Sequence, residues 1–182
     1  IGQRALPQGE IYFDNVRVPR RFAVALKDDY YGNMTSAWSF AGTHMGQAFT
    51  GVARAAFELA LQYCHERKQG GRTLIDHQLT RYRLGDMLRR VELCRSVARR
   101  SLAYARLSPL THPYVTAAGK VTVTQEAMKV VDEAFQLFGG AGMSREYPIE
   151  KLFRDARVAL IEDGENTILT MRLGVLAQQL YA

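Results

Sequence analysis

The sequence predicts an all-α fold, an antiparallel four-helix bundle with a short β segment at its N-terminus. Three observations indicate this fold. Apolar residues recur with a period near 3.6 from about residue 35 onward, in stretches of around thirty residues. Glycine or proline pairs separate these stretches, so the connections are short, as in antiparallel bundles. The first 34 residues carry instead one stretch rich in aromatic and β-branched residues.

Residues 1–34 are predicted to be the end of a β domain with its linker, and residues 35–182 a helical bundle domain. Alternation from Phe13 through Val18 predicts one or two short strands within residues 11–19, which end at a proline. A lone strand is not stable by itself, so this segment requires a sheet that the chain does not contain. We therefore expect the 182 residues to be a fragment of a longer polypeptide.

The first helix is predicted to span residues 35–67, with Thr35 or Ser36 as its N-cap, because a hydroxyl can accept a hydrogen bond from a first-turn amide. Gly70-Gly71 interrupts the helical pattern. Apolar positions three or four residues apart form the stripe that we expect to face the core: Met45, Phe49, Val52, Ala56, Leu59 and Tyr63.

The second helix is predicted over residues 75–106 and ends at Ser108-Pro109, and the third opens at Thr111-His112-Pro113 and runs toward Phe138. A short helix near residues 149–157 and a last helix over residues 165–180 follow. The residues expected to line the buried sides of the second and third helices are Leu84, Leu88, Val91, Val97, Leu102, Val121, Met128, Val131 and Phe135.

The composition excludes several classes of function. No apolar stretch is long enough to span a membrane and no signal-peptide pattern is present, so we expect an intracellular protein. The net charge is +6, but Asp86 and Glu92 interrupt the arginines of the second helix and no nucleic-acid motif accompanies them, which excludes nucleic acid as the main partner. Cys64 and Cys94 lack metal-ligand spacing and are expected to be reduced and buried, and no metal site is predicted.

Two loops stand out between Gln136 and Ile168. A helical pattern stops at Gly139-Gly140, where the lack of Cβ atoms allows a sharp turn or the close approach of a cofactor. Asp163-Gly164 then places a carboxylate on a short loop before the last helix, where it can be aimed at a substrate. On geometry alone, a helical hairpin with a glycine C-cap and an acidic N-cap explains the same pattern equally well.

Four segments, in the same order and spacing, resemble the C-terminal part of the acyl-CoA dehydrogenases, flavoenzymes that desaturate acyl-CoA thioesters between Cα and Cβ. Together they span nearly the whole chain. They are Phe13-Asp14-Asn15-Val16-Arg17-Val18-Pro19; Arg67 with Gly71 and Gln78; Gln136-Leu137-Phe138-Gly139-Gly140-Ala141-Gly142; and Arg154-Asp155-Ala156 followed by Ile161 and Gly164.

The resemblance implies a tetramer whose subunits contain a helical domain, a middle β domain and a C-terminal helical domain. FAD would lie between the last two, with its ADP portion reaching a neighbouring subunit. Arg67 would then hold the pyrophosphate through charge-assisted hydrogen bonds. Gln78 and Gln136 would offer amide hydrogen bonds, and Gly139 and Gly140 would let the backbone approach the adenosine.

In many members of this family, a glutamate directly before a glycine removes the Cα proton. That position is Asp163 here, followed by Gly164 in the substrate pocket. Aspartate is one methylene shorter, and a misplacement of about 1 Å can cost about a hundredfold in rate. Glu162 is the alternative base, although it stands where the family often has an aromatic residue.

Further departures concern the cofactor and the substrate. Thr167 is an expected flavin contact, although it differs from the residue that often stands there. Gly70 stands where the family often has phenylalanine, and Gly42 replaces an arginine that supports the catalytic acid in several members. Small residues at Gly42, Thr43 and Gly46 would widen the acyl pocket, so we expect a bulky, branched or cyclic acyl group, or a carboxylate supplied differently.

The resemblance leaves three functions open. The first and expected one is an FAD-dependent acyl-CoA dehydrogenase that passes electrons to an electron-transfer protein, as a homo- or hetero-tetramer in a bacterial cytoplasm rather than a mitochondrial matrix. The second is a non-catalytic partner subunit of a mixed tetramer, and the third a flavin monooxygenase of the same fold. The 182 residues alone are expected to be inactive, because much of the flavin site is missing.

Overall fold

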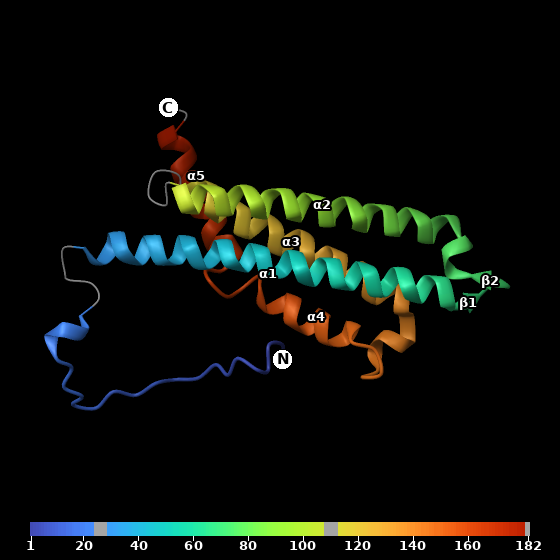
Figure 1. Ribbon diagram of the computed structural model, residues 1–182, viewed down its shortest axis with the longest axis horizontal. Helices are drawn as coiled ribbons and strands as arrows, with labels where there is room; N and C mark the ends of the chain where they lie inside the picture. Colours follow the sequence, from blue (N-terminus) through green and yellow to red (C-terminus); the bar gives the residue numbers. More distant parts are fainter. Residues whose placement is uncertain (24–28, 108–112, 181–182) are drawn as a thin grey trace.

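The computed structural model describes residues 1–23, 29–107 and 113–180, and their main feature is a bundle of long helices (Figure 1). Helices α1 (Tyr30–Glu66), α2 (Gln78–Leu107) and α3 (Pro113–Phe138) alternate in direction and lie side by side. The shorter α4 (Ile149–Val158) and α5 (Asn166–Leu180) both pack against α3. The predicted all-α antiparallel bundle is therefore confirmed.

The remaining elements are short. Strands β1 (Lys68–Gln69) and β2 (Arg72–Thr73) pair in antiparallel register as a hairpin at one end of the bundle. Three 3-10 turns are η1 (Arg20–Phe22), η2 (Leu74–Asp76) and η3 (Gly139–Met143). None of the helices in the described residues is long and apolar enough to cross a membrane.

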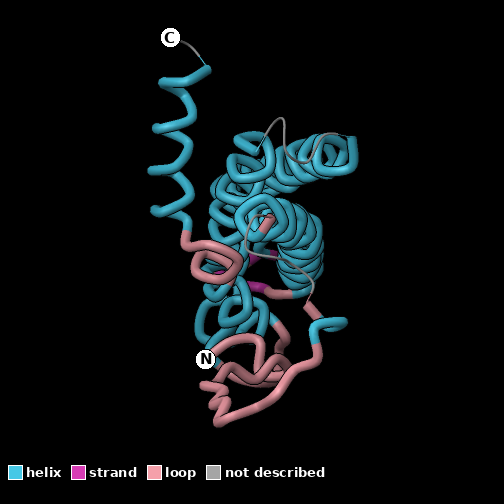
Figure 2. The backbone as a smooth tube through the Cα atoms, turned by 90° about the vertical axis from the view of Figure 1, so that its left-hand side faces the viewer, coloured by secondary structure: helices cyan, strands magenta, loops and turns pink. Residues whose placement is uncertain are grey.

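The strand predicted within residues 11–19 does not form. This segment has neither helix nor strand, and its side chains are exposed, with Ile11 and Phe13 each at 78%. In Figures 1 and 2 the segment runs as a loop outside the bundle. The physical reason is that the described residues form no sheet except the two-residue pair of β1 and β2, which this segment does not join, and an unpaired strand is not stable in water.

The helix boundaries differ from prediction at their N-terminal ends. Helix α1 begins at Tyr30, more than one turn before the predicted start, and Thr35 and Ser36 lie inside it. Its N-cap is Asp29, a residue type that favours this position, although its side chain makes no capping hydrogen bond. The predicted start of the second helix is the turn η2, and α2 begins at Gln78.

The C-terminal helices match prediction to within a residue. Helix α3 ends at Phe138, α4 extends one residue further than expected, and α5 begins one residue later. The predicted helix stop at Ser108-Pro109 and the predicted opening at Thr111-His112 lie outside the described residues.

Small residues form the contact line of α1 with the rest of the bundle. Phe49 and Ala56 of the predicted stripe are buried, while Met45, Val52, Leu59 and Tyr63 pack at its flanks. One prediction for α2 is wrong: Leu88 is 47% exposed. The buried face of α1 consists of Gly42, Thr43, Gly46, Phe49, Ala53, Ala56, Ala60 and Cys64.

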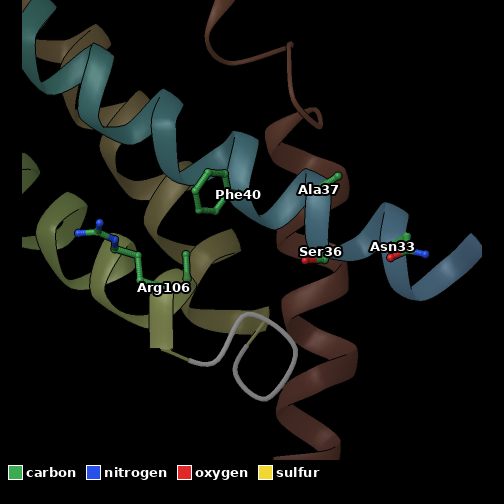
Figure 3. A pocket seen from close by; sticks show the side chains of 6 residues that line it. Asn33, Ser36, Ala37, Phe40 and Arg106 are labelled. Atoms are coloured by element: carbon green, nitrogen blue, oxygen red, sulfur yellow. The ribbon is translucent and has the colours of Figure 1, made fainter. Parts of the chain in front are cut away.

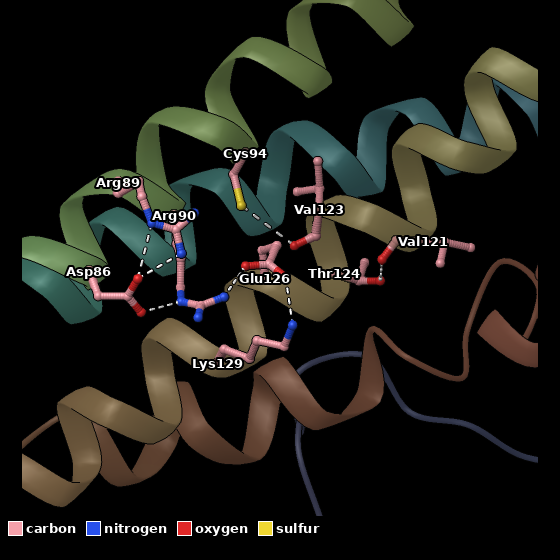
Figure 4. Close-up of polar contacts among 9 residues, drawn as sticks. All are labelled: Asp86, Arg89, Arg90, Cys94, Val121, Val123, Thr124, Glu126 and Lys129. Atoms are coloured by element: carbon pink, nitrogen blue, oxygen red, sulfur yellow. Dashed lines mark hydrogen bonds and ion pairs between the residues drawn. The ribbon is translucent and has the colours of Figure 1, made fainter. Parts of the chain in front are cut away.

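A partly buried ion network joins α2 to α3 (Figure 4). Asp86 accepts hydrogen bonds from Arg89 and Arg90, at 2.6 Å for each closest contact, and Arg90 also reaches Glu126 of α3. Hydrogen bonds from Arg89 and then Arg90 hold the pKa of Asp86 below its usual range. At Glu126, burial raises the pKa, but hydrogen bonds from Lys129 and Arg90 lower it, and the net result is a pKa below the usual range.

Both thiols are free and buried, as predicted. The Cys94 thiol points at the Val123 carbonyl oxygen, 3.7 Å away (Figure 4). Burial raises the pKa of Cys64, and burial followed by the nearby Glu126 carboxylate raises the pKa of Cys94 to about 11. Neither cysteine therefore has the thiolate character that reactive cysteines need.

Candidate functional site

Most of the predicted cofactor contacts meet at one end of the bundle, the right-hand end in Figure 1. We call this the glycine end; it comprises Arg67, Gln78, Gln136, Gly139 and Gly140. Arg67 directly follows α1, Gln78 opens α2, and the other three lie at the junction of α3 and η3. All five are exposed.

Three aromatic rings hold the start of η3 against the end of α1. We call Gly139 and Gly140, with which η3 begins, the glycine loop. Tyr63 stacks on Phe138, with ring centroids 4.2 Å apart, and its hydroxyl lies 3.5 Å from the Phe138 carbonyl oxygen. The Tyr147 ring packs against both, at 5.6 Å from Tyr63 and 5.1 Å from Phe138. The loop that follows Phe138 is therefore fixed by ring packing rather than by charge.

The glycine loop itself is open to approach. Gly139 adopts a left-handed backbone with φ +55, which a glycine after a helix adopts without a Cβ penalty. No heavy atom lies within 4 Å of the position that a Cβ would take at Gly139 or at Gly140. The backbone there can thus meet a bound group closely.

The Arg67 side chain is available for an anion. Among the described residues, its guanidinium makes no hydrogen bond or ion pair. The adjacent hairpin turns through Gly70 and Gly71, whose φ values of 63 and 80 suit a tight two-residue turn. A Cβ at Gly70 would lie 3.3 Å from the His77 ring, and His77 also contacts the Gln69 carbonyl oxygen at 2.9 Å. A bulky side chain at Gly70 would therefore be strained.

The predicted catalytic residues lie elsewhere, on the loop between α4 and α5. We call residues 162–165 the acid loop. Asp163 is exposed and has a left-handed backbone with φ +52, and Gly164 follows with φ +96. A Cβ at Gly164 would lie 3.0 Å from Leu169, so both the backbone angle and the close contact require glycine there.

The three acids of this loop have different surroundings. Glu162 accepts a hydrogen bond from the Gln3 side chain. Glu165 accepts hydrogen bonds from the amides of Thr167 at 2.8 Å and Ile168 at 3.1 Å, which lower its pKa, so Glu165 is the acidic N-cap of α5. Asp163 makes no side-chain hydrogen bond or ion pair with any described residue.

A buried lysine of α3, which sequence reasoning missed, lies beneath the acid loop. Lys120 is only 1% exposed, and its Nζ donates hydrogen bonds to the Gly164 carbonyl oxygen at 2.7 Å and to Asn166 Oδ1 at 2.8 Å. Burial lowers its pKa, while the carboxylates of Asp163, Glu162 and Glu165 oppose this shift. The available signal was its position on the apolar stripe of α3, one turn before Thr124 and two before Ala127.

The small residues predicted to widen a substrate pocket face the bundle. A Cβ at Gly42 would lie 3.6 Å from the Lys120 stem, and one at Gly46 would lie 3.9 Å from Ala98. Thr43 is buried, and its hydroxyl donates to the Ser39 carbonyl oxygen. Thr167, the predicted flavin contact, is exposed on α5, and its hydroxyl donates to Glu165 at 3.0 Å.

The glycine end and the acid loop are well separated within one chain. Gly42, which packs on Lys120, and Arg67 lie about 38 Å apart along α1 at the rise of an α-helix. The structure therefore brings the predicted pyrophosphate and adenosine contacts together, and places the predicted base and Thr167 in a second cluster.

An open depression lies beside the start of α1 and the end of α2 (Figure 3). Phe40 and Arg106 face it from the two helices, and no fully buried charged group lines it. Its full lining is Asn33, Ser36, Ala37, Phe40, Ala105 and Arg106. Among the described residues, no group of three or more His, Cys, Asp or Glu side chains could hold a metal ion.

Comparison with known proteins gives a consistent result. The family model described as "Acyl-CoA dehydrogenase, C-terminal domain" matches residues 36–177. Cyclohexane-1-carbonyl-CoA dehydrogenase of Geobacter metallireducens is 30% identical over 177 residues, which cover 92% of this chain and 44% of that protein. Glutaryl-CoA dehydrogenase of Desulfococcus multivorans is 30% identical over 173 residues, covering 94% of this chain and 44% of that protein.

Solved structures agree. The butyryl-CoA dehydrogenase of Megasphaera elsdenii superposes with a TM-score of 0.86 at 26% identity, covering 91% of this chain and 43% of that one. This chain thus spans less than half the length of the proteins that it matches.

Proposed function

The chain belongs to the acyl-CoA dehydrogenase family, and from this premise we propose that the protein containing it desaturates an acyl-CoA thioester, with FAD as cofactor and Asp163 as the base. In this reaction a proton leaves Cα, a hydride leaves Cβ, and a double bond forms between the two carbons. The Asp163 carboxylate takes the proton. When bound, FAD supplies the acceptor for the hydride.

The observation that carries this proposal is the difference among the three acids of the acid loop. Glu162 is engaged by Gln3, and Glu165 caps α5. The Asp163 carboxylate is exposed and has no partner among the described residues, so it is the one free to meet a substrate. This supports Asp163 over Glu162 as the base.

The residues of the glycine end fit the phosphates and adenosine of FAD. The Arg67 guanidinium, which makes no hydrogen bond or ion pair with any described residue, can form charge-assisted hydrogen bonds with a pyrophosphate. The open backbone at Gly139 and Gly140 leaves space for a flat ring system, and the exposed amides of Gln78 and Gln136 can donate or accept at its rim. At the acid loop, Thr167 would contact the flavin portion.

The separation of the two clusters supports a tetramer. A distance of about 38 Å along α1 suits an arrangement in which the glycine end contacts the ADP portion of a flavin whose reacting part lies at a neighbouring subunit. A homo-tetramer and a mixed tetramer are both compatible with this arrangement, and an electron-transfer protein would accept the electrons.

We also propose a bulky, branched or cyclic acyl group. The relative that acts, by its name, on cyclohexane-1-carbonyl-CoA supports a cyclic substrate. The contacts of Gly42 add no support, since it packs on the Lys120 stem in the core. A bacterial cytoplasm is the proposed location, in keeping with these relatives.

An anaerobic flavin titration tests the proposed function. The full-length protein that contains this chain would be mixed with straight-chain, branched and cyclic acyl-CoA thioesters, and the flavin absorbance recorded. Bleaching by a cyclic or branched thioester is the expected result. A bound flavin that no thioester reduces would overturn the dehydrogenase function and favour a partner subunit, or an oxygenase if reduced flavin then drives oxygen-dependent turnover.

A further inference from the structure

We propose that Lys120 is a positioning residue for Asp163. Its buried ammonium group holds the acid loop in the conformation that presents the Asp163 carboxylate, without touching that carboxylate itself. The catalytic meaning of this role rests on the proposed function, whereas the structural role of Lys120 can be tested independently.

The burial of Lys120 depends on the acid loop. Lysine is almost never fully buried unless it is paired, because an ammonium group removed from water must find hydrogen-bond acceptors. No carboxylate of the described residues lies within ion-pair distance of its Nζ. The two acceptors that it finds, Gly164 O and Asn166 Oδ1, belong to the first and the third residue after Asp163. A different loop conformation would therefore leave a buried charge without acceptors.

A second set of hydrogen bonds joins Asn166 to Thr124, and Thr124 back to the Lys120 backbone. Asn166, itself buried, donates from Nδ2 to Thr124 Oγ1 at 3.0 Å. Thr124 is fully buried on the same face of α3 as Lys120, and its hydroxyl donates to the Lys120 carbonyl oxygen at 2.9 Å. The backbone amide of Asn166 donates to the Leu160 carbonyl oxygen at 3.1 Å. The start of α5 is thus anchored to α3 by buried groups alone.

The backbone at Asp163 requires such an anchor. A positive φ is uncommon for a residue other than glycine and persists where the surroundings hold it. The carboxylates of Glu162 and Glu165 are engaged above the loop by Gln3 and by the α5 amides. From the α3 side, Lys120 fixes the Gly164 carbonyl, and with it the peptide plane between Gly164 and Glu165, one residue beyond Asp163. The loop backbone is thus restrained directly after Asp163.

Replacing Lys120 with methionine tests this role, because methionine fills a similar volume and cannot donate. In the full-length, flavin-loaded protein, K120M is expected to speed hydrogen–deuterium exchange in peptides covering residues 160–168 by about tenfold or more, since two charge-assisted hydrogen bonds are lost. The matched control is Lys129→Met, which removes an exposed lysine of the same helix and is expected to leave this exchange unchanged.

The kinetic readout separates positioning from general instability. K120M is expected to lower kcat by about a hundredfold, while KM and the flavin content stay within about threefold of the unmodified protein. Asn166→Ala, which removes one of the two acceptors of Lys120 and keeps the other, is expected to show a smaller increase in loop exchange and provides the test if K120M does not fold.

Unchanged exchange of residues 160–168 in K120M, or in Asn166→Ala if K120M does not fold, would overturn the proposal. The proposal would also be overturned if K120M showed increased exchange but an unchanged kcat. If no thioester reduces the flavin of the unmodified protein, the proposed function fails. The exchange measurement still shows whether Lys120 holds the loop.

Discussion

At the acid loop a buried charge and its hydrogen bonds hold the backbone in place, whereas at the glycine end stacked aromatic rings do so. Lys120, Thr124 and Asn166 form the support of the first region, and all three are buried. Tyr63 and Phe138 are central to the second, where their rings stack and the Tyr63 hydroxyl makes one long hydrogen bond to the Phe138 carbonyl oxygen. The two loops that these supports carry are both exposed and both turn through a left-handed glycine.

The difference reflects what each region is proposed to do. A base must be aimed to within a fraction of an ångström, and hydrogen bonds from a buried cation are directional. A surface that receives phosphates and a ring system needs open backbone and a free cation, and ring packing can fix such a loop without using its polar groups. Substitutions in the two regions should therefore have different consequences.

The largest effect is expected at Asp163. Asparagine also tolerates a left-handed backbone, so Asp163→Asn should keep the loop conformation and remove only the base. Anaerobic reduction of the flavin by the best thioester should slow by about 10²- to 10⁴-fold. Glu162→Gln, the matched control, should change this rate by less than about threefold. A large loss in the control with a small one in Asp163→Asn would assign the base to Glu162.

The next largest effect is expected at the glycine end. It should appear in the affinity for FAD rather than in the turnover of the flavin-loaded protein. Arg67→Ala removes a guanidinium that has no partner in the described part of the chain. It should weaken FAD binding by about ten- to a hundredfold, which corresponds to the loss of hydrogen bonds to a charged group. Flavin retention after dilution measures this. Turnover per bound flavin should be unchanged. Arg72→Ala in the neighbouring hairpin is the control, and equal losses in both variants would indicate a non-specific charge effect.

A pair of glycine substitutions sharpens the contrast in stability. Gly164→Ala forces a Cβ into a left-handed position 3.0 Å from Leu169, and should destabilise the fold by about 1–3 kcal/mol. Gly140→Ala meets no atom within 4 Å and should change the free energy of unfolding by less than about 0.5 kcal/mol. Urea unfolding measures both, and equal costs would contradict the described difference between the two loops.

The smallest effect on stability is expected for a substitution in the ion network of Asp86, Arg90 and Glu126, which joins α2 to α3. The folded pKa of Glu126 is below its unfolded value of 4.5, so its contribution to stability is present above that pH and is lost as pH falls through the folded pKa. The stability advantage of the unmodified protein over Glu126→Gln, about 1 kcal/mol, should therefore shrink as the pH falls below 4.5. Urea unfolding at several pH values measures it, and an advantage that grows toward low pH would contradict the assignment.

Much of the fold follows from sequence because helix periodicity and breakers are local signals. Helix α3 ends at Phe138 as predicted, since Gly139 stops it by its backbone alone. The predicted start of α1 at Thr35 or Ser36 is too late, because Asp29, Thr35 and Ser36 are all favourable N-cap residues and the sequence does not decide among them. The strand within residues 11–19 was overpredicted because β propensity says nothing about a pairing partner.

The site was predicted only in part, because the sequence does not show which residues contact one another across the fold. Resemblance to a family identified Asp163 and the residues of the glycine end, but the roles of the three neighbouring acids depend on contacts with Gln3 and with the α5 amides. Lys120 was passed over because lysine on a helix is normally a solvent-facing residue. Only the packing of the acid loop across α3 shows that its ammonium group has acceptors inside.

The two buried thiols have a practical consequence for labelling. Cys64 and Cys94 are fully buried, and the raised pKa of each disfavours the thiolate that maleimides attack. A cysteine introduced at Gln136 or Thr167, both exposed, would then be the reactive thiol of this chain. A fluorophore could be attached at either region without first removing the native cysteines, so motions of the acid loop and the glycine end could be followed separately in an otherwise unmodified fold.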